Sequence, residues 1–578
     1  MERRCRISAI DLAVTLGVPE TLHSSLMARL DRLGPVTKEV AQTGAVVGRE
    51  FSYELLRAVW ERDEAGLKEA LERLTDVGIV WCRGTAPLAQ YVFKHALLQE
   101  AAYGALLRGT RQLLHSQAAD ALISRSDEGA SAGPEIIANH LQFAGRSGDA
   151  IAYWRQAGER AVQRAANREA IGHLRRALSL LEVQPETAER RRVELAILLQ
   201  LGPALMSLHG WWASEVGEMI EHAGEVARGL KSSPELAPSL ANLWSFNIAR
   251  GRYDRAEENS RDLFRIAREL DDPEILLQAH HTAQGNLVLR GEFAAASEHI
   301  DAALLLYDAE RHAHHRYVYL GHDPGVCMLA LSAMMQSMLG YPGAAARREG
   351  EALIAGRGLG HAPSLAQALW FVCESQTARG DAPAVLDTAT ELLERSDEHG
   401  LLQLRSFALI FLGWALARSG ETSEGIARLV EGLSASTKMG GRMLMTRSLC
   451  LMAESLLSAG RYAEGLEQVT RAFDIAAQLG EQWNLSRLHR VHAELLLQVS
   501  GPNDKNAEAS LQQALAVARR QGARDWELRA ATSLARLWVD HGRHIDARRL
   551  LAPLYGRLAN EIDAPDLGEA RGLLDSLS

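Results

Sequence analysis

One sequence pattern recurs about every 40 residues over the second half of the chain, and it constrains the fold more than any other feature. A glycine is followed by an aromatic residue at +2 and a small residue at +5, as in the three copies GRYDRA (Gly251), GEFAAA (Gly291) and GRYAEG (Gly460). Looser copies begin at Gly340, Gly380, Gly420, Pro502 and Gly542, so the intervals are 40, 49, 40, 40, 40, 42 and 40 residues. Chance does not hold such a period over seven intervals, and we therefore predict a repeating structural unit.

The chemistry of the pattern predicts a pair of helices in each unit. Glycine ends the first helix because it tolerates the left-handed backbone conformation of a helix cap. The aromatic residue then opens the second helix and fills the gap between layers. A second small residue tends to follow at +12, two helical turns after the first, so both lie on one face where the paired helices can approach closely. The +12 position is small at Ala303, Ala352, Gly432, Ala472 and Ala514 and is leucine at Leu263, Leu392 and Leu554.

This register resembles the tetratricopeptide (TPR) repeat, whose second helix begins with the same Gly-x-aromatic-x-x-Ala run. The period is longer than the usual 34 residues, so we expect longer helices; HEAT and armadillo repeats share the longer period but not the register. We predict an all-α fold, a TPR-like α-solenoid over residues 251–578. Residues 136–250 read as irregular helical repeats, and stacking of neighbours would build one continuous core.

Residues 34–123 follow a different plan. KEVAQTGAVVG and FSYELLRAVW predict two short helices, EAGLKEALERLTDVGIV predicts a third, and VWCRGTAPLAQYVFKH predicts a β-hairpin. One further helix is expected from HALLQEAAYGALLRGTRQLLHSQAADALI. Three helices and a hairpin are typical of a small winged-helix domain. The Ser/Gly-rich segment 124–135 is expected to be a linker.

Several segments resemble bacterial STAND-type (AAA-type) signalling ATPases of the kind fused to class III adenylate/guanylate cyclase domains. They are VPETLHSSLMARLDRLGPVTKEVAQTGAVVGREFSYELL (18–56), YVFKHALLQEAAYGALLRGTRQLLH (91–115), HLQFAGRSGDAIAYWRQAGERA (140–161), GHDPGVCM (321–328) and LGYPGAA (339–345). The resemblance implies the order cyclase domain, P-loop ATPase core, winged helix and TPR-like repeats. It also implies that the winged helix packs against the ATPase rather than reading DNA.

This chain departs from that family in one decisive respect. A phosphate-binding loop needs GxxxxGK[ST], and no Gly-Lys dipeptide occurs anywhere in the sequence. We therefore expect no catalytic residue, no cofactor and no enzyme activity of the chain itself. Residues 1–33 would be the remnant of the last lid helix of an ATPase module, left by a truncated gene, a split gene or a late start.

The charge, the cysteine content and the lack of long apolar runs indicate the cellular compartment and the kinds of partner. The formal charge is −10, and residues 1–120 carry 15 basic and 15 acidic side chains, which argues against nucleic-acid binding. Five scattered cysteines without a CxxC pair are typical of reduced thiols. No apolar run reaches the roughly 18 residues that a membrane helix needs, and Asp11 interrupts the weakly signal-like N-terminus. These features predict a cytoplasmic protein.

The candidate binding residues come from the one long interval and from a tryptophan pair. The 49-residue unit between Gly291 and Gly340 carries an insertion at about Arg311–Met328, and insertions in repeats often form loops on the binding face. We predict that Tyr317, His322 and Asp323 belong to a ligand or partner site; the alternative is that Asp323-Pro324-Gly325 only starts a helix. The same segment holds His312, His314 and His315 beside His322 and Asp323, from which a zinc or iron site could be assembled. A solvated loop with one or two capping histidines is the interpretation that we prefer, so we expect no metal site. Trp211 and Trp212 are a second candidate, unless they are buried between layers.

The function that follows is a non-catalytic sensor or scaffold. The repeats would bind a protein, peptide or small-molecule effector on their concave face and relay its presence to an ATPase or cyclase module, present in trans or in a longer product. Two alternatives stay open. The chain could be the remnant of an ATP-binding adenylate cyclase, or a transcriptional regulator that uses its winged helix.

Overall fold

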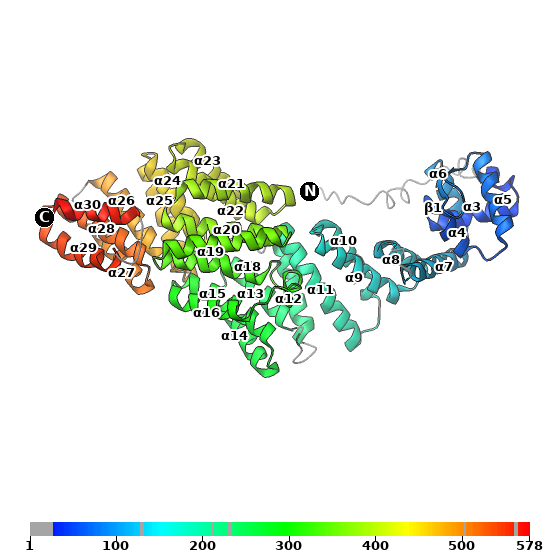
Figure 1. Cartoon of the computed structure of the whole chain (residues 1–578), viewed down its shortest axis with the longest axis horizontal. Coiled ribbons are helices and arrows are strands. Elements are labelled where there is room, and N and C mark those ends of the chain that lie inside the picture. Colours follow the sequence, from blue (N-terminus) through cyan, green and yellow to red (C-terminus); the bar gives the residue numbers. More distant parts are fainter. Residues whose placement is uncertain are drawn as a thin grey trace. The chain divides into compact units, whose positions relative to one another are not determined.

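A computed structural model describes residues 27–127, 132–210, 213–228, 234, 236–501, 504–559 and 565–577 (Figure 1). The chain divides into two compact units. The first comprises residues 1–160 and 172–185, and the second comprises residues 161–171 and 186–578. Each unit has its own hydrophobic core and is described separately.

The first unit begins with helices packed on a small sheet. Helices α3 (Pro35–Val47) and α4 (Tyr53–Val59) contact the strand β1 (Glu50–Ser52), and α5 (Glu64–Asp76) contacts β2 (Val80–Arg83). The third strand is β3 (Gln90–Phe93). The strands are antiparallel in the order β1-β3-β2, with Val80 opposite Phe93 and Phe51 opposite Tyr91. Helices α6 (Ala96–Gly104) and α7 (Arg108–Asp127) follow the sheet.

The predicted helices and hairpin are present in this unit, with three corrections. FSYELLRAVW is not all helix: its first residues form β1, because Ser52 caps α4 by accepting a hydrogen bond from the Leu55 amide (3.1 Å). The single helix expected after the hairpin is two helices, interrupted between Gly104 and Arg108. Finally, α7 runs to Asp127, so the first residues of the predicted linker are helical, and residues 128–131 lie outside the described residues.

The described residues between 134 and 249 form helices without a regular register. They form α8 (Pro134–Phe143), α9 (Ser147–Gln163), α10 (Asn167–Glu182), α11 (Ala188–His209), α12 (Ser214–Arg228) and α13 (Leu236–Ala249). The division between the two units falls within α9 and α10.

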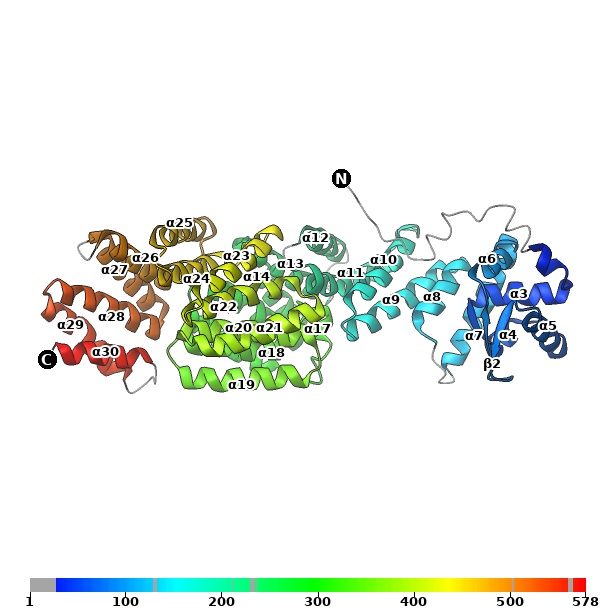
Figure 2. The same cartoon turned by 90° about the horizontal axis from the view of Figure 1, so that it is seen from above.

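The second unit continues as stacked helix pairs, which confirms the TPR-like solenoid. The first helix of each pair contacts the first helix of the next pair, and it also packs on its own second helix (Figure 2). In chain order, the first helices are α13, α15, α18, α20, α22, α24, α26 and α28. The remaining bounds are α14 (Tyr253–Leu270), α15 (Pro273–Leu289), α16 (Phe293–Leu306), α18 (Pro324–Met338), α19 (Pro342–Gly358), α20 (Ala362–Arg379), α21 (Ala382–His399), α22 (Leu402–Arg418), α23 (Thr422–Lys438), α24 (Met445–Ser458), α25 (Tyr462–Leu479), α26 (Leu485–Ser500), α27 (Lys505–Gln521), α28 (Arg524–Asp540) and α29 (His544–Leu558). A short α17 (His315–Val318) lies in the insertion, and α30 (Pro565–Ser576) follows the last pair.

The glycine of each repeat lies in the turn between the paired helices, and the small residues lie where those helices meet, as the pattern predicts. The turn glycines of the repeats have positive φ, for example +74° at Gly251 and +71° at Gly460. The small residues at +5 and +12 are buried between the paired helices. The closest approach is between α22 and α23, where a Cβ atom added to Gly425 would lie 2.4 Å from the carbonyl oxygen of Gly413. Only glycine allows this contact, because any side chain there would meet backbone.

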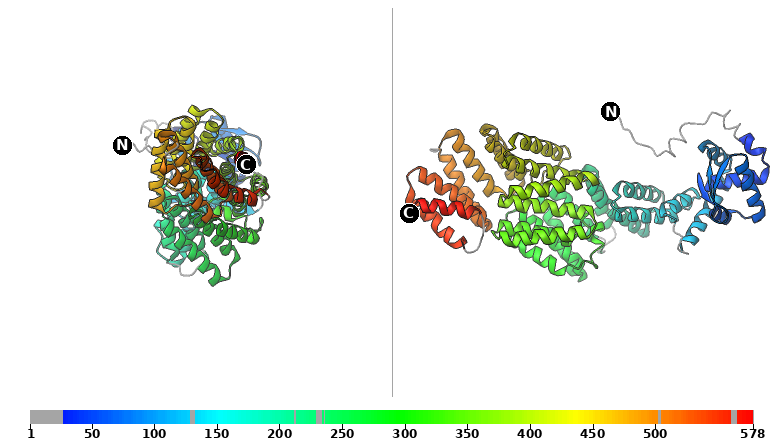
Figure 3. Two further views of the ribbon diagram at one scale, coloured as in Figure 1. Left: turned by 90° about the vertical axis from the view of Figure 1, so that its left-hand side faces the viewer. Right: turned by 45° about the horizontal axis from the view of Figure 1, so that its top comes forward.

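The array also closes on itself, which the sequence did not indicate. The carbonyl oxygen of Ala249 accepts hydrogen bonds from the amides of Arg442 (3.1 Å) and Met443 (3.3 Å), residues that lie 193 and 194 positions later. One core cluster accordingly extends from Ala237 to Trp526, and the helices that surround it can be followed by colour in Figure 3. The inner face of these repeats is therefore largely packed rather than an open groove. None of the described helices combines the length and the apolar character that crossing a membrane requires.

Candidate functional site

An apolar cavity lies inside the closed array. Its volume is about 80 Å³, and it is bordered by α13, α15, α18, α20 and the turns that precede α24 and α26. Three tryptophans and several aliphatic side chains supply most of the wall, and a few polar groups converge on it. The lining residues are Trp244, Ser245, Ile248, His281, Gln284, Gly285, Val288, Leu289, Leu320, His322, Cys327, Leu331, Met334, Gln367, Trp370, Phe371, Glu374, Met443, Leu444 and Trp483.

The polar groups on this wall are deeply buried. His281 is 3% exposed, and its Nδ1 has no hydrogen-bond partner among the described residues. Burial, helped by the neighbouring His322, lowers the pKa of His281 well below its usual value. The pKa of His322 is lowered to about 4, again because of burial. Both imidazoles are therefore neutral at pH 7, and such convergent polar groups in an apolar cavity are typical of small-molecule sites.

A buried ion pair stands directly behind the cavity. Arg447 Nη2 lies 2.8 Å from Glu374 Oε1, and the two side chains are 2% and 3% exposed. The Arg447 guanidinium also lies 4.5 Å from the ring centre of Phe411, within the range of a cation–π contact. Burial raises the pKa of Glu374 and lowers that of Arg447, although each charge partly offsets the effect on its partner.

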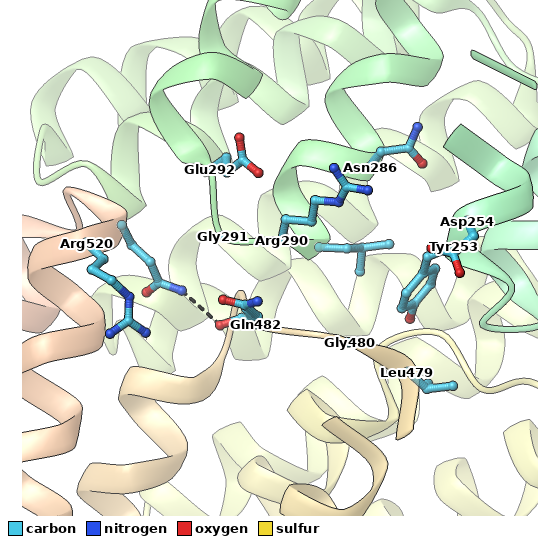
Figure 4. Close-up of a pocket in the computed structure, with 12 residues that line it drawn as sticks. Tyr253, Asp254, Asn286, Arg290, Gly291, Glu292, Leu479, Gly480, Gln482 and Arg520 are labelled. Atoms are coloured by element: carbon cyan, nitrogen blue, oxygen red, sulfur yellow. Dashed lines mark hydrogen bonds between the residues drawn. The ribbon is translucent and has the colours of Figure 1, made fainter. Parts of the chain in front are cut away.

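A second, polar pocket opens where the array closes (Figure 4). Its volume is about 390 Å³, within the range of ordinary ligand pockets. Arg290, one of its side chains, is ion-paired with Glu257. The side-chain amide of Gln521 donates to the carbonyl oxygen of Gln482 (2.8 Å). The lining residues are Tyr253, Asp254, Asn286, Leu289, Arg290, Gly291, Glu292, Leu479, Gly480, Gln482, Arg520 and Gln521.

One contact separates the polar pocket from the apolar cavity. The carbonyl oxygen of Leu289 accepts hydrogen bonds from the amides of Gln482 (2.8 Å) and Trp483 (3.2 Å). Leu289 lines both spaces, Gln482 lines the polar pocket and Trp483 lines the cavity. The strip that closes the array thus also lies between the two spaces.

The residues predicted from the insertion separate in the structure. His322 lines the apolar cavity, with its ring 5.4 Å from that of His281. Asp323 is fully buried and caps α18: it accepts from the Val326 amide (3.1 Å) and from the Tyr307 hydroxyl (3.0 Å). Asp323 thus starts a helix, as the alternative interpretation held.

Tyr317 contacts a different neighbour. It is half-buried in α17, with its ring edge-on to His361 at 5.5 Å. Trp211 and Trp212 lie outside the described residues. Of the predicted binding residues that the structure describes, His322 lines the apolar cavity, and a binding role for any of them stays a prediction.

The histidines of the insertion likewise fall into two groups with metal-binding potential. His312 and His315 meet Glu274 at the start of α15, whereas His322 meets His281 and Cys327 in the apolar cavity. In each group, the three ligand atoms lie within 4.8 Å of one another. The turn at Leu320 and Gly321, with φ of +52° and +75°, lies between the two groups along the chain.

Sequence reasoning missed the residues that dominate the cavity. Trp244, Trp370 and Trp483 come from three distant repeats and meet only because the array closes. Glu374 could have been predicted from the sequence, because it is an acidic residue within the apolar run ALWFVCES. Such a residue must be either a buried charge with a partner or an error in the helix assignment.

No family model matches the chain. An uncharacterized protein of Rhizobium meliloti is 28% identical over 522 residues, which cover 90% of this chain and 50% of that protein. The chain therefore spans about half the length of this curated relative.

Solved structures with similar folds are distant in sequence. A Rap protein complexed with competence and sporulation factor is 13% identical with a TM-score of 0.46, covering 68% of this chain and all of that one. A STAND protein with a tetratricopeptide repeat sensor from Pyrococcus horikoshii is 11% identical with a TM-score of 0.31, covering 97% of this chain and 68% of that one. Because both scores lie below 0.5, the fold assignment rests on the helix pairs and their spacing.

Proposed function

We propose that the chain is the effector-sensing part of a signalling protein, and that the effector is a small amphipathic molecule. The observation that carries the proposal is the position of the Leu289–Trp483 contact between a polar pocket and an apolar cavity. A molecule with a polar end and an aromatic or aliphatic end would occupy both spaces, and it would have to displace this contact.

The size of the apolar cavity supports a mechanism by population shift. A cavity of about 150 Å³ is known to hold benzene, and this one measures about 80 Å³. A ring-sized group therefore fits only when the walls move apart. A ligand that binds the opened array better than the closed one shifts the equilibrium toward the opened form.

The closed inner face argues for a small effector rather than a long peptide. The core from Ala237 to Trp526 fills the space in which an extended peptide would lie in an open TPR groove. A protein partner would instead meet the outer surfaces of the repeats or the first unit.

A fluorescent probe and a disulfide lock test the proposal. The probe 1-anilinonaphthalene-8-sulfonate carries an aromatic body and an anionic group, which Arg520 in the polar pocket could meet. A Cβ atom added to Gly251 would lie 3.6 Å from Cβ of Arg442, within disulfide range. Because it would also lie 2.9 Å from Leu479 Cδ2 at a φ of +74°, the oxidised and reduced forms are compared within the same double variant. The double variant Gly251→Cys/Arg442→Cys, made in a Cys82→Ser background, would therefore lock the closure when oxidised.

We expect probe binding by the reduced variant and at least tenfold weaker binding by the oxidised one, with near-UV circular dichroism unchanged. Arg520→Ala should weaken binding about two- to fivefold, as for loss of one exposed charge contact. Arg347→Ala, an exposed arginine on α19 outside the pocket, is the matched control. Equal binding by the oxidised and reduced proteins would refute a site that depends on opening.

We further propose that the first unit is a winged helix that relays the state of the array to an ATPase or cyclase module. The resemblance of segments 18–56 and 91–115 supports this, as does a relative twice as long as the matched region. Exposed apolar side chains on this unit, Trp81 (60%), Leu88 (76%) and Leu107 (79%), suit a protein partner better than DNA. Where a P-loop ATPase is encoded in frame or next to this chain, its ATPase rate should differ between the oxidised and reduced locked variant; an unchanged rate would contradict the relay.

A further inference from the structure

The insertion in the long repeat unit holds a group of side chains that the effector proposal does not use. Glu274 lies in the first turn of α15, and His312, His314 and His315 lie on the insertion that follows α16. His315 Nε2 is 3.4 Å from Glu274 Oε2, and His314 Nε2 is 3.8 Å from the same oxygen. The ring centres of His312 and His315 are 5.0 Å apart. We propose that Glu274, His312 and His315 form a binding site for a divalent transition-metal ion of the zinc type.

The ligand distances suit such an ion. Bonds of about 2.0–2.2 Å in a tetrahedral site place the ligand atoms roughly 3.4 Å apart. The three ligand atoms here lie within 4.8 Å of one another, and one pair is already at 3.4 Å. Small side-chain rotations therefore bring them to bonding distance. One carboxylate with two imidazoles is a donor set that Zn²⁺, Fe²⁺ and Co²⁺ accept and that Ca²⁺ and Mg²⁺ do not prefer.

Outer contacts already orient these ligands. His312 Nδ1 lies against the backbone of Asp308, 2.9 Å from its amide nitrogen and 3.0 Å from its carbonyl oxygen, which directs the other ring nitrogen away from that backbone. His315 Nδ1 is 2.9 Å from the side-chain amide of Gln278, a residue that is 1% exposed. Arg311 Nε holds Oε1 of Glu274 at 2.9 Å, and Oε2 is the oxygen that faces the imidazoles. A metal-binding histidine donates its second N–H to a carbonyl or carboxylate oxygen. Asp308 O can accept in this way from His312, and the Gln278 side-chain oxygen, which has no hydrogen-bond partner among the described residues, would accept from His315 Nδ1 once the amide group turns over.

The site is buried on one side and open on the other. His312 and His315 are 2% and 0% exposed, whereas the side chains of Glu274 and His314 are 28% and 57% exposed. An ion can therefore enter from solvent, and His314 or water can complete its coordination. Because the insertion also supplies Leu320 and His322 to the wall of the apolar cavity, a bound ion would fix that wall.

The test uses the full chain without a purification tag. After incubation with Zn²⁺ and removal of the excess, we expect one equivalent of zinc by elemental analysis. Glu274→Gln and His315→Gln should each abolish stoichiometric binding, and Gln278→Ala should weaken it about 10–100-fold, the usual effect of losing an outer partner. His299→Gln is the matched control, because it alters a comparable histidine contact with His280 at 2.8 Å, in the same helix pair but outside the site. Unchanged circular dichroism of the variants separates loss of ligation from loss of fold.

Co²⁺ distinguishes this site from the second group, His281, His322 and Cys327. The proposed site has no sulfur ligand, so bound Co²⁺ should show visible d–d absorption without thiolate-to-metal charge transfer. A charge-transfer band that disappears in Cys327→Ser would place the ion in the apolar cavity and overturn the proposal. Absence of stoichiometric zinc in the wild-type chain would overturn it as well.

Discussion

The buried Glu374–Arg447 pair gives the sharpest test of how the interior of the array is held together. Arg447 on α24 and Glu374 on α20 are joined at 2.8 Å, and both side chains are at most 3% exposed. We change each residue alone, as Arg447→Met and Glu374→Gln, and both together. Glutamine keeps an oxygen that can accept from Trp370 Nε1, which lies 3.3 Å from Glu374 Oε1.

The expected loss in free energy of unfolding follows from the burial of the two charges. Removing one member of a buried pair leaves the other charge without compensation, and such changes cost about 3–5 kcal/mol. Arg447→Met also loses the contact with Phe411, a cation–π interaction of about 0.5–2 kcal/mol. The double variant removes both charges, so we expect it to lie within about 2 kcal/mol of the wild type. The coupling free energy of the cycle should then be at least about 3 kcal/mol.

The assay is a double-mutant cycle measured on the full chain. Urea unfolding followed by circular dichroism gives the free energies, and hydrogen exchange of α20 and α24 checks the result locally, since repeat arrays can unfold in segments. The control cycle uses the surface pair Arg428 and Glu424, which are 2.8 Å apart with side chains 41% and 52% exposed. We expect its coupling to be about 0.3–0.5 kcal/mol. A buried pair whose coupling equals that of the surface pair would refute the reasoning.

Two further predictions concern the helix contacts of each unit. Gly425→Ala should destabilise α22 and α23 by about 1–3 kcal/mol, because the new Cβ would meet the Gly413 carbonyl oxygen at 2.4 Å. The control Gly350→Ala, in open space on α19, should instead stabilise the protein by about 0.5–1 kcal/mol. Both effects are measured by the melting temperature and by local hydrogen exchange. The second concerns His115 and His140, which face each other at 2.9 Å and whose pKa values burial lowers to about 3 and about 4. The unfolded chain therefore takes up protons below about pH 6.5 that the folded chain does not, so stability is complete above that pH and falls by about 3 kcal/mol per histidine toward pH 4. The measurement is the hydrogen-exchange protection factor of α7 and α8, which corrects for the pH dependence of intrinsic exchange; protection factors that stay constant over that range would contradict the prediction.

Much of the repeat fold could be predicted, because it is encoded locally. A glycine with positive φ and a small residue one turn later act within a single helix pair, so the period alone located the turns at Gly251, Gly291 and Gly460. The strand β1 was not predicted, because three residues are too few to show an alternating pattern and because its pairing with β3 joins residues about 40 positions apart.

The candidate sites were harder to predict, because they depend on how small rotations between repeats accumulate. Leu289 meets Trp483 only after several repeats have turned the chain back on itself. Conversely, His312 and His322 are ten residues apart and still belong to different groups, because the left-handed turn at Leu320 and Gly321 redirects the chain between them. Neither effect is visible in a motif.

The closure also explains how a small molecule could act on so large an array. Moving a two-state equilibrium from 1:99 to 99:1 requires about 5.5 kcal/mol of differential binding. The closing strips at Ala249 and Leu289 contain four backbone hydrogen bonds, each worth a net 0.5–1.5 kcal/mol or so. Very small ligands gain at most about 1.5 kcal/mol per heavy atom, so about four well-placed atoms at that ceiling supply about 5.5 kcal/mol of differential binding. A peptide that filled an open groove would not need to break these hydrogen bonds, so its binding would not change the equilibrium between the closed and opened arrays.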